Sequence, residues 1–230
     1  MQLLYTGKTK DLYDNGDGSY TFKLKDDATG KDGKFDPGEN QVGLSIEGLG
    51  RESLKITKYF FELLEGQGIP TQWLGCDLDE VTMRVRPANV LGTNPGGGLE
   101  FVCRRTAGGS FIRRYGAYAK TGQDLDYLVE VTLKDDGRAD PPITKDALVT
   151  LGILTDEEFE TCKALTKRIA KAIHADFAPK GLELSDMKVE FGRAGGEIIL
   201  IDEISGGCMR VFRNGELVAP MELTKLILGE

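Results

Sequence analysis

Apolar and polar residues alternate with a period of two in several stretches of the chain, as they do in strands that bury one face. The alternation predicts strands at residues 2–5, 11–13, 20–25, 80–86, 99–103 and 127–133. Because the first three surround a cluster of turn residues at 15–18, we expect an N-terminal β-meander.

A period near 3.6 predicts two helices. The first begins near Arg51 and carries its apolar residues on one face. The second spans 155–178, where Thr155 and Glu158 form a capping box and an apolar stripe follows. Pro179 then ends this helix, because proline cannot continue the hydrogen-bonding pattern.

Strands and helices come in mixed blocks, so we expect an α+β fold and not a doubly wound parallel sheet. The predicted architecture has two lobes with mostly antiparallel sheets flanked by helices, divided near Pro87 into residues 1–86 and 87–230. The glycine-rich stretch 30–50 has little periodicity, so it is predicted to be a loop over a site.

A hairpin is predicted from strands at 184–191 and 197–204, joined through the glycines between them. Side chains alternate along a strand, so Asp186, Lys188 and Glu190 share a polar face. The second strand is apolar and runs directly into Asp202.

The register of this hairpin decides which carboxylates meet. If Arg193 lies opposite Ile199 across a five-residue loop, Glu190 lies opposite Asp202, and two such oxygen donors suit a nucleotide-bound Mg²⁺. A tight turn would change that register. The alternative is a solvated face whose charges pair across the strands.

Four arginines bracket a run of small residues and a serine in the segment 104–114. Small residues let a backbone approach a ligand, and guanidinium groups match carboxylate and phosphate oxygens. Arg104 and Ser110 are therefore candidate ligands of an anionic substrate. The alternative is an ordinary basic helix edge on an acidic protein.

Two further segments could lie near a ligand. Lys8 and Lys10 sit in a turn that could reach nucleotide phosphates, although the segment matches neither a Walker loop nor a dinucleotide fingerprint. Lys134 and Asp140 follow a strand and are either loop ligands or parts of a polar turn.

Composition and charge exclude several classes of function. Hydrophobic residues make up 40% and charged residues 29% of the 230 positions, as in globular proteins. The formal net charge of −8 disfavours a nucleic-acid partner. Neither a signal peptide nor a run of about 18 apolar residues is present, so we expect a soluble, cytoplasmic protein with no membrane partner.

The cysteines and the single histidine offer no obvious catalytic group. The four cysteines lack the spacing of zinc sites or disulfide frameworks, so we expect reduced thiols. Cys103 and Cys208 are interpreted as packing residues. His174 lies within the long predicted helix, which argues against a histidine-based triad.

Taken in order, these segments resemble the family of phosphoribosylaminoimidazole-succinocarboxamide synthases, the SAICAR synthetases of purine biosynthesis. The resemblance covers nearly the whole chain. Its most specific part is Lys-x-Glu-Phe-Gly at 188–192, followed by Asp-Glu-x-Ser at 202–205 and then by Arg210. Further motifs lie at 4–10, 25–29, 68–71, 104–110, 133–136 and 140–141.

The resemblance implies a ligase with the SAICAR synthetase fold and its ATP site in the cleft. ATP, L-aspartate and the carboxylate CAIR would give SAICAR, ADP and phosphate, with an acyl phosphate as the intermediate. Mg²⁺ is the implied cofactor and ATP the cosubstrate. The partners are these small molecules, and a homodimer is an option that the sequence leaves open.

The resemblance also implies roles for individual residues. The lobe 1–86 would bind the nucleotide, and the lobe 87–230 would bind the substrate and the metal. Lys8 and Lys10 would hold ATP phosphates, while the strand at Arg84 and Arg86 would offer its backbone to adenine. The substrate ligands would be Arg104, Ser110, Lys188 and Arg210, the metal ligands Glu190 and Asp202, and the catalytic residues Lys134 and Asp140.

The sequence departs from the family pattern at four places. These are Arg51-Glu52 after the glycine-rich stretch, the pair Arg105-Thr106, the insertion-like stretch 93–98, and the end of the chain at Glu230 before a further helix. Three alternatives stay open: a small-molecule kinase, a non-catalytic nucleotide sensor, and a related amide ligase with a changed amine or carboxylate.

Overall fold

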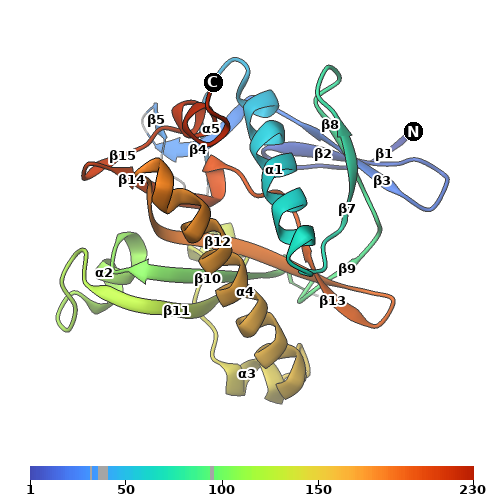
Figure 1. The fold of residues 1–230 in the computed structure, drawn as a ribbon. Coiled ribbons are helices and arrows are strands. Elements are labelled where there is room, and N and C mark those ends of the chain that lie inside the picture. The colour runs from blue at the N-terminus through green and yellow to red at the C-terminus, as the bar shows by residue number, and fades with distance from the viewer. Residues whose placement is uncertain (32, 36–40, 94–95) are drawn as a thin grey trace. The chain divides into compact units, whose positions relative to one another are not determined.

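The computed structural model describes residues 1–31, 33–35, 41–93 and 96–230, drawn in Figure 1. The chain forms two compact units, which we describe one at a time. Unit 1 comprises Met1–Ala88, Asp202–Cys208 and Val218–Glu230, and unit 2 comprises Asn89–Ile201 and Met209–Leu217. The predicted lobes 1–86 and 87–230 differ from these units, because two C-terminal segments return to unit 1.

Unit 1 is built on a five-stranded antiparallel sheet in the order β1-β2-β3-β8-β7. Its strands are β1 (Gln2–Thr6), β2 (Lys10–Asp14), β3 (Tyr20–Leu24), β8 (Thr82–Val85) and β7 (Trp73–Asp77). The N-terminal meander and the strand within 80–86 are therefore as the alternation predicts. Strand β7 was not predicted from the sequence.

Helix α1 (Leu49–Gly66) packs against β3, β7 and the C-terminal helix α5 (Pro220–Leu228). Its buried face includes Leu54, Phe60 and Phe61, as the 3.6-residue period predicts. The side chain of Asp26 accepts hydrogen bonds from the backbone amides of Gly48 and Gly50, which satisfies donors at the start of the helix.

The prediction of a loop at 30–50 is wrong for the described part of that stretch. A three-stranded sheet in the order β5-β4-β6 occupies it, formed by β4 (Asp27–Lys31), β5 (Lys34–Phe35) and β6 (Val42–Ser45). Backbone pairing holds these short strands, so they need little side-chain periodicity. Pro37, and residues 94 and 95 of the insertion-like stretch 93–98, lie outside the described residues.

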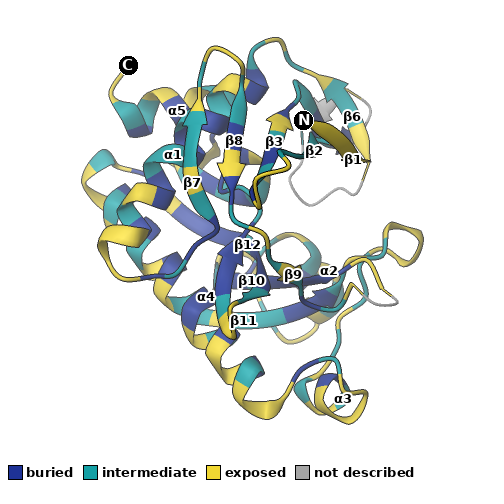
Figure 2. Ribbon diagram, turned by 90° about the vertical axis from the view of Figure 1, so that its right-hand side faces the viewer, coloured by how far each residue is buried: buried dark blue, intermediate teal, exposed yellow. Residues whose placement is uncertain are grey.

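Unit 2 contains a seven-stranded antiparallel sheet centred on the long strand β12 (Glu183–Ala194). Strands β10 (Leu99–Thr106) and β14 (Met209–Arg213) flank one half of β12. The sheet is completed by β11 (Asp124–Leu133) beside β10, β15 (Glu216–Leu217) beside β14, and β13 (Glu197–Ile201) and β9 (Asn89–Val90) beside the other half of β12. Figure 2 shows that β10 and β12 are largely buried.

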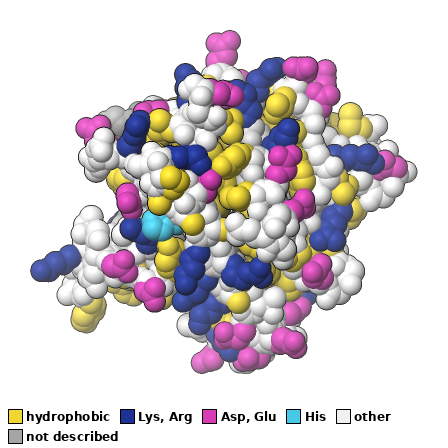
Figure 3. All heavy atoms as spheres, in the orientation of Figure 1, with side chains coloured by type: hydrophobic (Ala, Val, Ile, Leu, Met, Phe, Trp, Pro, Cys, Tyr) yellow, Lys and Arg dark blue, Asp and Glu magenta, His cyan; other side chains and the backbone are white. Residues whose placement is uncertain are grey.

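The long helix α4 (Asp156–Phe177) packs against β10, β11 and β12, and it begins with the predicted capping box of Thr155 and Glu158. Its inner side chains include Ile169 and Phe159, whose ring lies 6.5 Å from that of Phe101. Lys and Arg side chains gather over its outer face (Figure 3). The short helices of unit 2 are α2 (Gly109–Tyr115), α3 (Lys145–Thr150), η1 (Asp136–Arg138) and η2 (Ala178–Lys180), while η3 (Gly206–Cys208) precedes β14.

The hairpin of β12 and β13 forms, but its predicted register is wrong. Ala194 pairs with Glu197, so the turn has only the two residues Gly195 and Gly196, both with positive φ. A two-residue turn of this kind matches the twist of the strands, and it favours glycine because its residues have positive φ. As a result Glu190 lies opposite Ile201, and Asp202 follows the end of the ladder.

No helix among the described residues is long and apolar enough to cross a membrane.

The start of α4 gives a testable dependence of stability on pH. The Arg193 guanidinium contacts Glu158 through Nε at 2.5 Å and Nη2 at 2.9 Å, and the Thr155 amide also donates to this carboxylate. Against the effect of burial, these hydrogen bonds lower the pKa of Glu158 from 4.5 to about 2. The stabilisation is therefore present above pH 4.5 and is lost as the pH falls toward 2.

We predict that Glu158→Gln lowers the free energy of unfolding at pH 7 by about 2 kcal/mol, because charged hydrogen bonds are lost. Urea denaturation at several pH values measures this. The variant should also lose less stability than the parent between pH 4.5 and 2. Glu157→Gln, at an exposed position of the same turn, is the control, and equal acid sensitivity of Glu158→Gln and the parent would contradict the assignment.

Candidate active site

One face of the unit 2 sheet is apolar and the other is polar, because β10, β11 and β12 pair in a fixed register. Phe101 lies opposite Val189, and Cys103 lies opposite Met187, on the apolar face. On the other face Glu100 lies opposite Thr132, and Asp186 lies opposite both Arg104 and Arg210. We call this second surface the polar face. It brings together all four residues predicted to bind the substrate.

Arg104 is buried, and two side chains hold it. Its Nε donates to Glu130 at 2.5 Å, and its Nη2 donates to the hydroxyl of Ser110 at 3.0 Å. The ring of Phe111 lies 5.8 Å from the guanidinium carbon. Two of the predicted substrate ligands, Arg104 and Ser110, are thus in direct contact.

Arg210 is held against a glycine by Asp186. Its Nη1 donates to the Asp186 carboxylate at 2.9 Å, and Asp186 is buried. A Cβ atom at Gly109 would lie 2.8 Å from Arg210 Nη1, and Gly109 has a φ of +50°. A larger residue there would displace the guanidinium, so the small residues before Ser110 allow its close approach.

Lys188 pairs with Glu100 on the same face. The ammonium group donates to one oxygen of Glu100 at 2.6 Å, and the hydroxyl of Thr132 donates to the other at 3.0 Å. Glu100 is only 4% exposed, so the lysine charge compensates a carboxylate that is almost removed from water.

Lys134 and Asp140, the predicted catalytic residues, lie in and beside the turn after β11. Lys134 donates to the buried Glu190 carboxylate at 2.7 Å. Asp140 accepts a hydrogen bond from the backbone amide of Asp135, which closes the turn. Burial raises the pKa of Asp140, the amide contact opposes this, and the negative charge of Glu100 raises it further.

In unit 1, Lys10 bridges two neighbouring carboxylates. Its ammonium group lies 2.5 Å from Asp202 and also contacts Glu203. Burial alone would lower the pKa of Lys10, but the two carboxylates raise it above its usual range. Burial and the charge of Asp202 raise the pKa of Glu203, and Lys10 opposes this shift.

Asp202 itself has a left-handed backbone, with φ at +70°. The side-chain amide of Gln72 donates to its carbonyl oxygen at 3.0 Å. A non-glycine residue in this conformation is strained, and such strain persists where surrounding contacts require it. Contacts within unit 1 therefore hold Asp202 in this backbone conformation.

The predicted adenine contact near Arg84 and Arg86 falls in strand β8 and just after it. Strand β8 pairs with β3 on one side and β7 on the other, with Arg84 opposite Thr21 and Gly75. The amide of Arg86 donates to Gln72, and its Nε donates to the carbonyl of Thr71. The Arg84 side chain binds Asp17 in the turn between β2 and β3. Lys8 is exposed in the turn before Lys10.

The chemistry of Glu190 and Asp202 fits Mg²⁺, although their predicted pairing across the hairpin is wrong. Mg²⁺ takes oxygen ligands and commonly uses one or two carboxylates together with substrate phosphates and water. Among the described residues no group of three potential ligands could hold a metal by itself. Each carboxylate already has a lysine partner, so each site is compatible with a positive charge.

Comparison with known proteins gives the family. The sequence profile described as SAICAR synthetase matches residues 3–223. The phosphoribosylaminoimidazole-succinocarboxamide synthase of Clostridium tetani is 53% identical over 99% of this chain and 100% of its own length. This chain belongs to the SAICAR synthetase family. The enzyme of the same name from Finegoldia magna is 33% identical over 92% of this chain and 86% of its own.

Solved structures agree with this assignment. A SAICAR synthetase in complex with ADP superposes with a TM-score of 0.84 and 26% identity, covering 98% of this chain and 97% of its own. The α+β fold with antiparallel sheets is therefore the family fold. Members of the SAICAR synthetase family are ATP-dependent ligases of purine biosynthesis, which confirms the predicted enzyme class over a kinase or a nucleotide sensor.

Arg105, one of the residues at which the sequence departs from the family pattern, is not on the polar face with the predicted substrate ligands. Arg105 is adjacent to Arg104 and pairs with Glu183 at 2.8 Å. Burial lowers the pKa of His174, and the charge of Arg105 lowers it further. His174 is also hydrogen-bonded to the Tyr127 hydroxyl at 2.7 Å. The histidine therefore belongs to a group of side chains separate from the polar face.

All four cysteines are free thiols, as expected. Burial raises the pKa of the Cys103 thiol to about 12, so it is neutral near pH 7.

Sequence reasoning missed the acids Glu100 and Glu130, which hold two of the predicted substrate ligands. A usable signal was present, because Glu100 alternates with apolar residues in its strand and Glu130 does so in the neighbouring one. A carboxylate at such a position has to find a cation. The cation could be identified only once the strands were in register.

The pair formed by Lys188 and Glu100 predicts coupled effects on stability. Lys188→Met leaves the Glu100 carboxylate buried without its cation, and should lower the free energy of unfolding by about 2 kcal/mol. The double variant Lys188→Met/Glu100→Gln should recover part of that loss, because the buried charge is gone. Urea denaturation of the parent, both single variants and the double variant measures the coupling, and strictly additive effects would contradict the pairing.

Proposed function

We propose that the polar face of unit 2 binds CAIR and that the turn carrying Lys8 and Lys10 in unit 1 binds the phosphates of ATP. The observation that carries this assignment is the convergence of Arg104, Ser110, Lys188 and Arg210 on one face of the sheet. Three cations and a hydroxyl suit a substrate with a phosphate and a carboxylate. Membership of the SAICAR synthetase family supports the choice of CAIR.

The chemistry proceeds in two displacements. A carboxylate oxygen of CAIR attacks the γ-phosphorus of ATP, and the bond to ADP breaks. The amine of L-aspartate then attacks the acyl carbon, and the carbon–oxygen bond to phosphate breaks. SAICAR and phosphate result, the phosphate keeps one former carboxylate oxygen, and the nitrogen loses protons to solvent or to a neighbouring base.

The residues of the polar face reduce the repulsion between anionic reactants. Arg104, Lys188 and Arg210 are already oriented by carboxylates, so little side-chain ordering is needed when the substrate binds. Fixed positive charges in a partly buried surface are more effective than charges in water. We assign Arg104 and Ser110 to the phosphate of CAIR, and Lys188 and Arg210 to its carboxylate.

Lys10 in unit 1 has a different task. Its ammonium group lies on Asp202 and Glu203, and nucleotide phosphates would compete for it. Asp202 is then free to turn to a cation, while Glu203 still balances the lysine. In this way the arrangement exchanges one set of charge partners for another without leaving a buried charge uncompensated.

Glu190 and Asp202 would hold Mg²⁺, which when bound would neutralise phosphate charge during transfer. Lys134 would remain near Glu190 and contribute positive charge. Asp140 lies close enough to Glu100 and Lys188 for their charges to shift its pKa, so we place it beside the substrate. Lys134 and Asp140 remain the proposed catalytic residues.

The proposed reaction predicts ADP release that depends on aspartate. Purified protein with Mg-ATP and CAIR should release ADP in step with SAICAR formation when L-aspartate is present. A coupled assay measures the ADP, and mass analysis identifies the product. A stable phosphorylated acceptor without amide would show a kinase, and loss of activity without CAIR is the control.

The metal assignment predicts that Glu190→Gln and Asp202→Asn each lower kcat/KM about a hundredfold, or about 2.7 kcal/mol in activation free energy. The variants keep the shape of the side chains, and urea denaturation checks that they remain folded under the assay conditions. Titration of activity with Mg²⁺ should show that each variant needs a higher Mg²⁺ concentration than the parent. Glu216→Gln, at an exposed position, is the control. Parent-like activity and Mg²⁺ dependence in both variants would remove these residues from the metal site.

A further inference from the structure

Glu130 holds two arginines at once. Its Oε2 accepts from Arg104 Nε at 2.5 Å, and both its oxygens lie 2.7 Å from Arg114 Nη2. The side chains of Arg104 and Glu130 are 4% and 12% exposed, and that of Arg114 is 25% exposed. The three groups therefore form a largely buried cluster with one carboxylate and two cations, which we call the arginine pair site.

Helix α2 supports both guanidinium groups. The ring of Phe111 lies 5.8 Å from the Arg104 guanidinium carbon, and that of Tyr115 lies 5.2 Å from the carbon of Arg114. Ser110, on the same helix, accepts from Arg104. Side chains from β10, β11 and α2 thus fix Arg104 on several sides, and Glu130 is the only acid among them that the structure shows bound to it.

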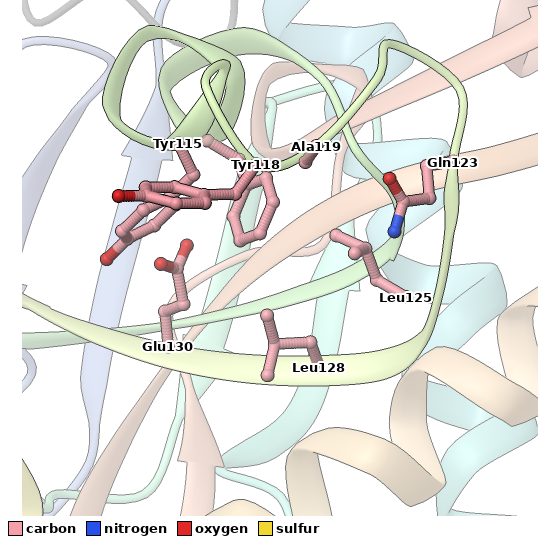
Figure 4. Close-up of a pocket in the computed structure, with 8 residues that line it drawn as sticks. Tyr115, Tyr118, Ala119, Gln123, Leu125, Leu128 and Glu130 are labelled. Carbon is pink, nitrogen blue, oxygen red and sulfur yellow. The ribbon is translucent and has the colours of Figure 1, made fainter.

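Glu130 also lines a pocket of about 450 Å³ in unit 2. In Figure 4 its carboxylate points from β11 toward the side chains of Tyr115 and Tyr118, while Leu125 and Leu128 lie along the same strand. The rest of the lining is mainly aromatic and aliphatic, and no other acid is among the described residues that line the pocket. The two guanidinium groups therefore depend on Glu130 for charge compensation on this side.

We propose that Glu130 is a positioning residue for the substrate, acting through Arg104, and that Arg114 shares this carboxylate so that the cluster keeps a net charge of about +1. The inference rests on the proposed function, because it takes Arg104 as a ligand of CAIR. Glu130 engages Nε, and Ser110 engages Nη2, which uses two of the five N–H donors of the guanidinium. Fixing Nε sets the plane of the group, and the remaining donors can meet a phosphate.

Arg114 keeps the cluster positively charged even though Glu130 pairs with Arg104. A one-to-one pair of Arg104 with Glu130 would have no net charge, and would attract an anion weakly. The second arginine restores a positive balance beside the substrate. Removing Glu130 would leave too much positive charge, because the two guanidinium groups would repel each other. Arg104 would also lose the contact that fixes the plane of its guanidinium group.

The test compares Glu130→Gln, Glu130→Asp and Arg114→Met with the parent, and uses Glu157→Gln as an exposed acidic control on the same unit. Steady-state kinetics vary CAIR, ATP and aspartate in turn, and calorimetry measures CAIR binding without turnover. Glu130→Gln should raise KM and Kd for CAIR at least tenfold and leave KM for ATP and aspartate within twofold. Glu130→Asp should recover part of the CAIR affinity, and Arg114→Met should weaken it severalfold.

The outcomes separate the two levels of the proposal. If the parent binds CAIR but forms no SAICAR, the proposed function fails, and the Kd series still tests Glu130. If Glu130→Gln only lowers kcat or the folded fraction, with KM and Kd for CAIR unchanged, Glu130 is merely structural and the inference fails. If that variant does not fold, Glu130→Asp and Arg114→Met decide, and parent-like CAIR affinity in both would overturn the inference.

Discussion

One constraint governs the polar face of unit 2, because each buried charged group there, Arg104, Glu100 or Asp186, needs a group of opposite charge close to it. Arg104 has Glu130, Lys188 has Glu100, and Arg210 has Asp186. A charge taken out of water without a partner costs several kcal/mol, so the fold can bury these groups only as pairs. The same pairs hold the cations in place before any substrate arrives, and stability and binding therefore depend on the same contacts.

Antiparallel register makes this arrangement compatible with a core. In β10 and β12 successive side chains point to opposite faces, so one set of residues packs under α4 and the other remains polar. A slip of one residue would exchange the two sets and bury the charges under the helix. Phe101 opposite Val189, and Arg104 opposite Asp186, show both sets in the same pair of strands.

Much of this could be predicted from the sequence because it depends on local periodicity. The capping box at Thr155, the face of α1 and the meander of unit 1 follow from spacing alone. The family resemblance predicts that Arg104, Ser110, Lys188 and Arg210 bind the substrate, and the structure brings these four onto one face. Periodicity also separated Glu190 from Val189, and placed it with the polar side chains of β12.

Contacts between distant segments could not be predicted in the same way. The hairpin register depended on whether Gly195 and Gly196 form the whole turn, and a wider loop fitted the sequence equally well. Strands β4, β5 and β6 are held by backbone pairing within a glycine-rich stretch that has no side-chain pattern. Glu130 is 26 positions from Arg104, so its role appeared only when β10 and β11 were paired.

The most direct test of the central claim is a crystal structure of this protein with SAICAR bound. The account predicts that the anionic groups of the product contact Arg104, Ser110, Lys188 and Arg210, with Glu130 still bound to Arg104. A product bound away from the polar face, or an Arg104 that leaves Glu130 to reach it, would contradict the account.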